Sequence, residues 1–312
     1  MQNYSTPVFI HAIGSAKGEK ANIADLEPAI ISENNTLTLS ALGVEHYRRT
    51  HKSHEDLLRE AVEQTLKSES CSPGKIDFVL LSSHTFTHYQ TAVPVISDTL
   101  KKMGIHAPVE LIYLSRCASG ISAIHYGKSL IASGEASCIL TILVDKVNDE
   151  YKGRTLNGGM SLFSDGASSF ILSRQGYGFR VEYLNEYMDN EMVDVKPEAN
   201  LVHYLQQFAQ GLKKVAGNVL AQAGVKPDQV RYVVTGNYNL SIMMNYGRIA
   251  GFKSHQLYTE EVNENSHLYS SDIVLNLEAM RRKKQIAHGD RLLVLGTGSY
   301  HWGAMTVTYI EE

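Results

Sequence analysis

Two kinds of apolar pattern alternate along the chain. From His54 to Ser68 the apolar residues fall on one helical stripe, and a Ser-Pro-Gly turn then leads into a continuous apolar run from Ile76 to Leu81. The stripe predicts an amphipathic helix and the run predicts a buried strand. Similar helix and strand patterns alternate to the end of the chain, which is typical of an α/β architecture with strands buried between helices.

The same unit recurs in the second half of the 312 residues. An apolar helical pattern from Leu212 to Ala223 stops at Gly224, and a strand pattern runs from Val230 to Val234. Pro73 and Pro227, Ile76 and Val230, and Phe78 and Tyr232 pair at one constant offset. The repeat predicts an internal duplication, with one half at residues 1–174 and the other at 175–312.

One segment carries a candidate nucleophile. Residues 110–114 read as a strand, residues 115–120 as a tight turn with Cys117, and residues 121–133 as a helix that ends at Gly134. Unpaired N–H groups and the positive dipole end at a helix entrance stabilise a thiolate. We therefore expect Cys117 to be an activated thiol. A buried structural cysteine is the alternative, and it is the interpretation for Cys138, whereas Cys71 falls in a polar turn.

Composition excludes several classes of function. A formal charge of −4 and a pI near 6.4 argue against a nucleic-acid surface. No apolar stretch is long enough for a membrane span, and no secretory signal is present, so we expect a cytoplasmic protein. Three cysteines form no disulfide framework. His84 and His88 lack a third ligand pattern, so no metal site is expected.

Three motifs together resemble β-ketoacyl-acyl-carrier-protein synthase III and its relatives in the thiolase superfamily. They are Ser115-Arg116-Cys117-Ala118-Ser119-Gly120, the turn Phe163-Ser164-Asp165-Gly166-Ala167, and the C-terminal run from Gly289 to Ala304 with its Gly-rich loop. The resemblance implies the thiolase fold, in which two pseudo-duplicated halves form a five-layered αβαβα sandwich. It also implies that Cys117 carries an acyl group as a thioester.

The chain departs from the family pattern at the usual partners of the cysteine. By the resemblance, Gly236 falls where a His is expected, and His267 falls on the usual Asn position. Asn265 is a register alternative to His267, and Asn239 matches a family position near Gly236. The Gly-rich loop implies an oxyanion role for Gly298 and Ser299, and it brings His301 into consideration as a further partner. The expected pair is Cys117 with His267.

These residues favour an acyltransferase or an atypical condensing enzyme, of the kind found in specialised-metabolite biosynthesis. One imidazole suffices as a general base for acyl transfer to a small-molecule acceptor. The loss of one donor disfavours decarboxylative condensation with a malonyl carrier protein. A thioester hydrolase and a non-catalytic partner subunit of a heterodimeric ketosynthase are the alternatives.

The resemblance also indicates substrates and partners. The donor is expected to be an acyl-CoA or an acyl-carrier-protein thioester, with Arg48 or Arg49 contacting the nucleotide of coenzyme A, and no tightly bound cofactor is expected. A homodimer is expected, built from the strand at residues 136–144, and a heterodimer stays open.

Overall fold

A computed structural model describes residues 6–26, 33–67, 72–86, 89–113, 115–147, 154–156, 159–195 and 199–312. In these residues nine strands form one continuous sheet, in the order β11-β12-β13-β10-β1-β9-β6-β4-β5. Its strands are β1 (Val8–Lys17), β4 (Phe78–Ser82), β5 (Val109–Ile112), β6 (Cys138–Asp145), β9 (Gly166–Ser173), β10 (Gly178–Met188), β11 (Tyr232–Val234), β12 (Arg291–Thr297) and β13 (His301–Ile310).

The remaining elements flank this sheet or connect its strands. Two short ribbons pair β2 (Glu19–Asn22) with β3 (His46–Arg49), and β7 (Thr155–Leu156) with β8 (Ser161–Leu162). The helices are α1 (Glu33–Ala41), α2 (His54–Leu66), α3 (Tyr89–Lys102), α4 (Ser119–Ser133), α5 (Leu201–Ala223), α6 (Leu240–Ile249), α7 (Val262–Asn265) and α8 (Asp272–Arg282).

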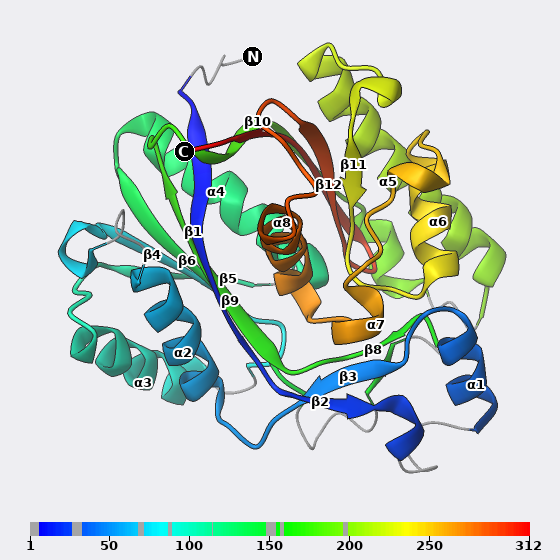
Figure 1. The fold of residues 1–312 in the computed structure, drawn as a ribbon, viewed down its shortest axis with the longest axis horizontal. Helices are drawn as coiled ribbons and strands as arrows, with labels where there is room; N and C mark the ends of the chain where they lie inside the picture. The colour runs from blue at the N-terminus through cyan, green and yellow to red at the C-terminus, as the bar shows by residue number, and fades with distance from the viewer. Residues whose placement is uncertain are drawn as a thin grey trace.

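The sheet bends at β1 and β10 so that two helices lie inside it (Figure 1). Helix α4 contacts β4, β6 and β9 on one side and β12 and β13 on the other, and α8 contacts β1, β11 and β12. Helices α2 and α3 cover the outer face of one half, and α5 and α6 cover the outer face of the other. The five layers of the expected αβαβα sandwich are therefore present, as in the thiolase fold.

Strand order repeats in the two halves. The first half has the order β5-β4-β6-β9-β1, and the second has β11-β12-β13-β10, with parallel pairing at β4–β6 and at β11–β12. A parallel bridge between Val233 and Leu257 stands where the first half has β5. Short 3-10 turns begin at Pro73 and at Pro227, before β4 and β11 respectively. The expected boundary at residue 174 falls between β9 and β10, and it stays a prediction.

Close backbone approach fixes the second half of the sandwich. Trp302 on β13 is fully buried, and a Cβ added to Gly211 of α5 would lie 2.5 Å from its indole ring. Only a glycine allows the helix to pack this closely on the indole, which buries a large apolar surface. This contact sets the position of α5, whose first turns reach the site described below.

Two expectations from the sequence are corrected by the fold. The strand at residues 136–144, expected to join two subunits, is β6, and its two edges pair with β4 and β9 inside the sheet. A strand with both edges paired has no free N–H and C=O groups for a partner. Helix α5 begins at Leu201 and not near Leu212, because Asn200 caps its N-terminus by accepting from the His203 N–H.

The structure tests two other expectations only in part. Cys71 and His88 lie outside the described residues. Within the part of the chain that is described, every helix is too short or too polar to cross a bilayer. The cytoplasmic location stays a prediction.

Candidate active site

Cys117 lies in a 3-10 turn, Arg116–Ala118, that leads directly into α4. Arg116 has a φ of +50°, in the left-handed region that non-glycine residues seldom occupy. Such strain costs about 1–3 kcal/mol and persists at sites where the surrounding packing imposes it. Here it turns the chain so that the thiol sits at the helix entrance, as the sequence predicted.

His267 reaches this thiol from the other half of the molecule. Its Nε2 lies 3.2 Å from Cys117 Sγ, across 150 residues of sequence. The main chain of His267 is held on both sides, because its N–H donates to Leu162 O and its C=O accepts from the Ser164 N–H. The motif at residues 163–167 therefore helps to position the histidine. Ser266, which precedes it, also has a positive φ of +48°.

A carboxylate orients the imidazole. Asp272 is fully buried in the first turn of α8, and its Oδ2 lies 2.5 Å from His267 Nδ1. The same carboxylate accepts from the main-chain N–H groups of Asn237 and Leu268 and from the Asn237 side-chain amide. A carboxylate with this many donors, at the positive end of a helix, is stabilised in its charged form. It fixes Nδ1 as the protonated nitrogen and turns Nε2 towards sulfur.

The electrostatics favour a thiolate–imidazolium pair. Burial opposes the thiolate, but the charge of His267 and hydrogen bonds from His267 and His84 lower the pKa of Cys117 to about 7. Burial also opposes the imidazolium, but the charges of Cys117 and Asp272 raise the pKa of His267 to about 10. Near neutral pH about half of the sulfur is therefore ionised, and the thiolate is the state that attacks a thioester.

A small cavity of about 280 Å³ opens onto the sulfur. Its aromatic wall consists of Phe163, Tyr204, Phe208, Tyr238 and Tyr246, and its other lining residues are His84, Arg116, Cys117, Thr155, Leu156, Met160, Thr297, Gly298 and Ser299. Burial raises the pKa of Tyr238 and of Tyr246, so both phenols stay neutral and hydrogen-bond with Thr297. The volume lies at the lower end for ligand pockets, which fits a short acyl group.

The Gly-rich loop packs against the turn that carries Cys117. A Cβ at Gly298 would lie 3.1 Å from Ser115 O, so a glycine permits this close approach. The Gly298 N–H donates to His301 O, and Gly298 and Ser299 both line the cavity. His301 does not line the cavity, and its Nε2 bonds Glu186, which also binds Ser122 and His125. His301 is thus placed in a side-chain cluster beside the loop.

The other predicted residues lie elsewhere. Asn239 caps α6 by accepting from the Ile242 N–H. Asn265 is buried and bonds Glu261, Lys17 and Arg48. Arg49 is exposed on β3 and Arg48 pairs with Glu264, so neither arginine lines the cavity. In the described residues no three acidic, His or Cys side chains gather as metal ligands.

Gly236 leaves room for the rings around the thiol. A Cβ at this position would lie 3.0 Å from the Tyr238 ring and 3.2 Å from His267 Cε1. The rings of Tyr238 and His267 lie 4.8 Å apart. A side chain at residue 236 would displace both.

Sequence reasoning missed three residues of the site. Asp272 follows His267 by five positions at a helix start, a signal that suits an orienting carboxylate. Asn237, which bonds that carboxylate, gave no signal. His84 was considered only as a metal ligand with His88, whereas in the structure it lines the same cavity as Cys117 and helps to lower the pKa of the thiol. The expectation of a single histidine at the thiol is therefore incomplete.

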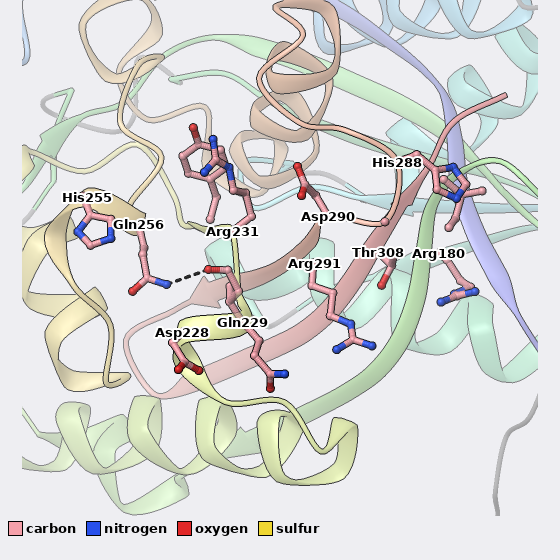
Figure 2. Close-up of a pocket in the computed structure, with 14 residues that line it drawn as sticks. Arg180, Asp228, Gln229, Arg231, His255, Gln256, His288, Asp290, Arg291 and Thr308 are labelled. Carbon is pink, nitrogen blue, oxygen red and sulfur yellow. Dashed lines mark hydrogen bonds between the residues drawn. The ribbon is translucent and has the colours of Figure 1, made fainter.

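A larger hollow of about 970 Å³, whose lining residues are drawn in Figure 2, lies at the other end of β12. It is bordered by the first residue of β12, Arg291, whereas Thr297 at the last position of β12 borders the cavity with Cys117. Its charges are mixed, with Arg180, Arg231 and Asp228 on its walls. None of the candidate catalytic or binding residues named from the sequence lines it, so we place the candidate active site at the smaller cavity.

Comparison with protein families matches two parts of the chain. Residues 114–187 match the family model of 3-oxoacyl-[acyl-carrier-protein] synthase III, and residues 220–309 match the model of its C-terminal part. The first range contains Cys117, and the second contains His267 and Asp272.

Individual proteins that are similar to this chain come from the same family or share its fold. The chain is 22% identical to β-ketoacyl-[acyl-carrier-protein] synthase III of Aquifex aeolicus, over 80% of this chain and 82% of that protein, and 25% identical to the enzyme of a Ruegeria species, over 86% and 89%. Among solved structures, the acyltransferase ChlB3 superposes with a TM-score of 0.85 at 18% identity, covering 97% of this chain and 98% of that one. The priming β-ketosynthase of the R1128 polyketide pathway superposes with a TM-score of 0.80 at 16% identity, covering 97% and 96%.

Proposed function

Since the chain is an acyl-transferring enzyme of the ketoacyl synthase III type in the thiolase superfamily, we propose that Cys117 accepts an acyl group as a thioester and passes it to a small-molecule acceptor. The observation that carries this proposal is the run of contacts from Cys117 through His267 to Asp272 at a small cavity. It combines a nucleophile, a base and an orienting group.

The donor is an acyl-CoA or an acyl-carrier-protein thioester, and no tightly bound cofactor is needed for the chemistry. The Cys117 thiolate attacks the thioester carbonyl, and the thiol of the donor leaves. The main-chain N–H groups of Cys117 and Ser299 are our candidates for the oxyanion hole, because both residues border the cavity and the Gly298 N–H is already bonded. Arg48 and Arg49 remain our candidates for contact with a coenzyme nucleotide.

A role in specialised metabolism is part of this proposal. ChlB3 and the R1128 ketosynthase, which share the fold, are an acyltransferase and a polyketide priming enzyme respectively. The cavity wall with Tyr204, Tyr238 and Tyr246 suits a short or aromatic acyl group better than a long alkyl chain. The sequence argued against decarboxylative condensation because only one hydrogen-bond donor, His267, was expected beside Cys117. Because His84 is a second donor, that argument weakens, and condensation has to be tested directly.

Intact mass spectrometry tests the proposal. Incubation with a panel of short-chain and aromatic acyl-CoA and acyl-carrier-protein thioesters should add one acyl mass to the wild type and none to Cys117→Ala. A stable adduct that small amines or alcohols discharge supports transfer. An adduct lost in plain buffer supports hydrolysis, and release by malonyl carrier protein with loss of CO₂ supports condensation. No adduct with any donor would falsify the acyl-carrier role of Cys117.

We further propose a homodimer joined through β5. In the described residues β5 pairs only with β4, so its other edge is unpaired at one end of the nine-stranded sheet. Exposed Tyr113 follows this strand directly. Free strand edges pair readily with a second strand. Sedimentation should give the mass of two chains, and a monomer at micromolar concentration would contradict the proposal.

A further inference from the structure

A second histidine contacts the thiol from the opposite half of the molecule. His84 follows β4 in the first half, it lines the same cavity as Cys117, and it and the thiol shift each other's pKa through hydrogen-bonding and charge. His267 and its partner Asp272 belong to the second half. The sulfur of Cys117 therefore has two imidazole partners that come from different segments of the chain.

The loop that carries His84 is rigidly held. Asp145, fully buried at the end of β6, accepts from the N–H groups of His84 and Thr85, at 2.6 and 2.9 Å, through a single oxygen. That oxygen also accepts from the hydroxyls of Ser83 and Thr85. The ring of His84 meets the Tyr269 ring edge-on, with 5.7 Å between the centroids. A ring fixed this firmly at a reacting sulfur is preorganised for proton transfer.

The two histidines respond differently to the charge on sulfur. Burial lowers the pKa of His84, and the hydrogen bond and charge of Cys117, with a smaller contribution from Asp145, raise it above its ordinary value against the opposing charge of Arg116. The pKa of His267 is raised by Cys117 as well, but also by the charge and hydrogen bond of Asp272. When Cys117 is acylated its charge disappears, and the main support for a proton on His84 disappears with it. His267 keeps the support of Asp272.

We propose that His84 is a second catalytic residue, which moves the proton in both half-reactions, while His267 remains the hydrogen-bond donor that holds Cys117 and the thioester. This inference rests on the proposed acyl transfer through Cys117 and assigns the proton steps within it.

The proton balance closes over one cycle. In the first half-reaction a bond forms between Cys117 Sγ and the acyl carbon, the bond from that carbon to the donor sulfur breaks, and the donor thiolate takes the proton of the His84 imidazolium. In the second, neutral His84 takes the proton of the acceptor as the acceptor bonds to the acyl carbon. The bond to Sγ then breaks, and its electron pair returns to the Cys117 thiolate. His84 ends protonated, as it began.

The first test needs no substrate. The rate of alkylation of Cys117 by iodoacetamide is followed against pH by peptide mass spectrometry, which separates Cys117 from other thiols. We expect the midpoint near pH 7 to move upward in His84→Gln, because contacts that lower the pKa of the thiol are lost. His54→Gln is the matched control, since His54 is buried beside the same loop and bonds Thr85. It should keep the wild-type midpoint, and an unshifted midpoint in His84→Gln would refute the contact with the thiol.

The second test separates the half-reactions. In single turnovers with the best donor found for the wild type, His84→Gln should slow both formation of the adduct and its transfer to an acceptor by about 10²-fold or more. His54→Gln should slow neither. Circular dichroism and thermal unfolding identify a folded variant, and His84→Asn replaces the glutamine variant if it does not fold.

The outcomes separate this inference from the proposed function. Wild-type turnover with an equally fast His84→Gln overturns the role of His84 and leaves acyl transfer intact. Equal losses in the two glutamine variants show a structural effect of the loop, and they overturn the inference too. A wild type that forms no adduct overturns the proposed function, and the proton steps assigned to His84 fall with it.

Discussion

At the scale of single residues, the site depends on buried charged groups that stabilise one another's ionised forms. The thiolate of Cys117 and the imidazolium of His267 are each opposed by burial and favoured by the other. Asp272 adds the third charge and, through its bonds to Asn237 and Leu268, ties the pair to the protein backbone. Removal of one member of such a network leaves the others buried and unsatisfied, so the effects should be large.

Asp272→Asn should raise the midpoint for alkylation of Cys117 above about pH 7 and slow acyl transfer by about 10²-fold or more. The carboxylate raises the pKa of His267, so its loss lowers that pKa. A neutral imidazole stabilises the thiolate less than an imidazolium does, and the pKa of Cys117 therefore rises. The amide can also present an N–H to Nδ1 and reverse the tautomer. The pH profile of alkylation measures this change.

Asp290→Asn is the matched control, because Asp290 accepts the Ala287 N–H in an exposed turn before β12. It should keep the wild-type profile. An Asp272→Asn variant with wild-type midpoint and transfer rate would show that the carboxylate does not act through His267.

At the scale of elements, helix α5 shows how one residue type has opposite effects at two positions. Gly211 lies against Trp302 with no room for a Cβ, whereas around Gly217 a Cβ would meet nothing within 4 Å. Both glycines lie inside the same 23-residue helix. The position of the helix matters to the site, because Tyr204 and Phe208 on α5 line the cavity.

Gly217→Ala should therefore stabilise the protein by about 0.5–1 kcal/mol, the gain in helix propensity. Gly211→Ala should destabilise it, because the indole or the helix must move, and overpacking typically costs about 1–3 kcal/mol. Urea unfolding of both variants gives the two free energies of unfolding. Equal effects of the same sign would contradict the packing described for α5 and β13.

At the scale of the whole molecule, one sheet and one site span both halves. Strand β10 pairs with both β1 and β13, so the sheet runs unbroken between the halves, and α4 packs on both. The site is shared as well, since Cys117 and His84 come from one half and His267 and Asp272 from the other. Neither half can keep the site without the other.

We expect the halves to unfold in one transition. Trp302 is the single tryptophan and is buried in the second half, so its fluorescence reports on that half. Circular dichroism in the far ultraviolet reports on helices of both halves. The two urea transitions should coincide, as for a cooperative unit. Separate midpoints would show that the halves are independent domains.

The sequence by itself determined the local elements and the candidate nucleophile. Apolar periodicity is a short-range property, so it predicted α2 and β4 and the strand, turn and helix around Cys117. Through the family resemblance it also singled out His267, which the structure places 3.2 Å from the thiol, and the catalytic role of that residue stays a prediction.

Only the tertiary structure decided which distant side chains meet. No local pattern marks His84 as a partner of Cys117 or Asn237 as a partner of Asp272, because these contacts arise from the packing of two halves around α4 and α8. The order of strands in the sheet was likewise not readable from the sequence. The apolar pattern of β6 does not tell whether the strand lies inside the sheet or at its edge, and the structure places β6 inside and β5 at the edge. The apolar pattern along a chain determines which face of a helix or strand is buried. Which other elements that face contacts depends on how all the elements pack together.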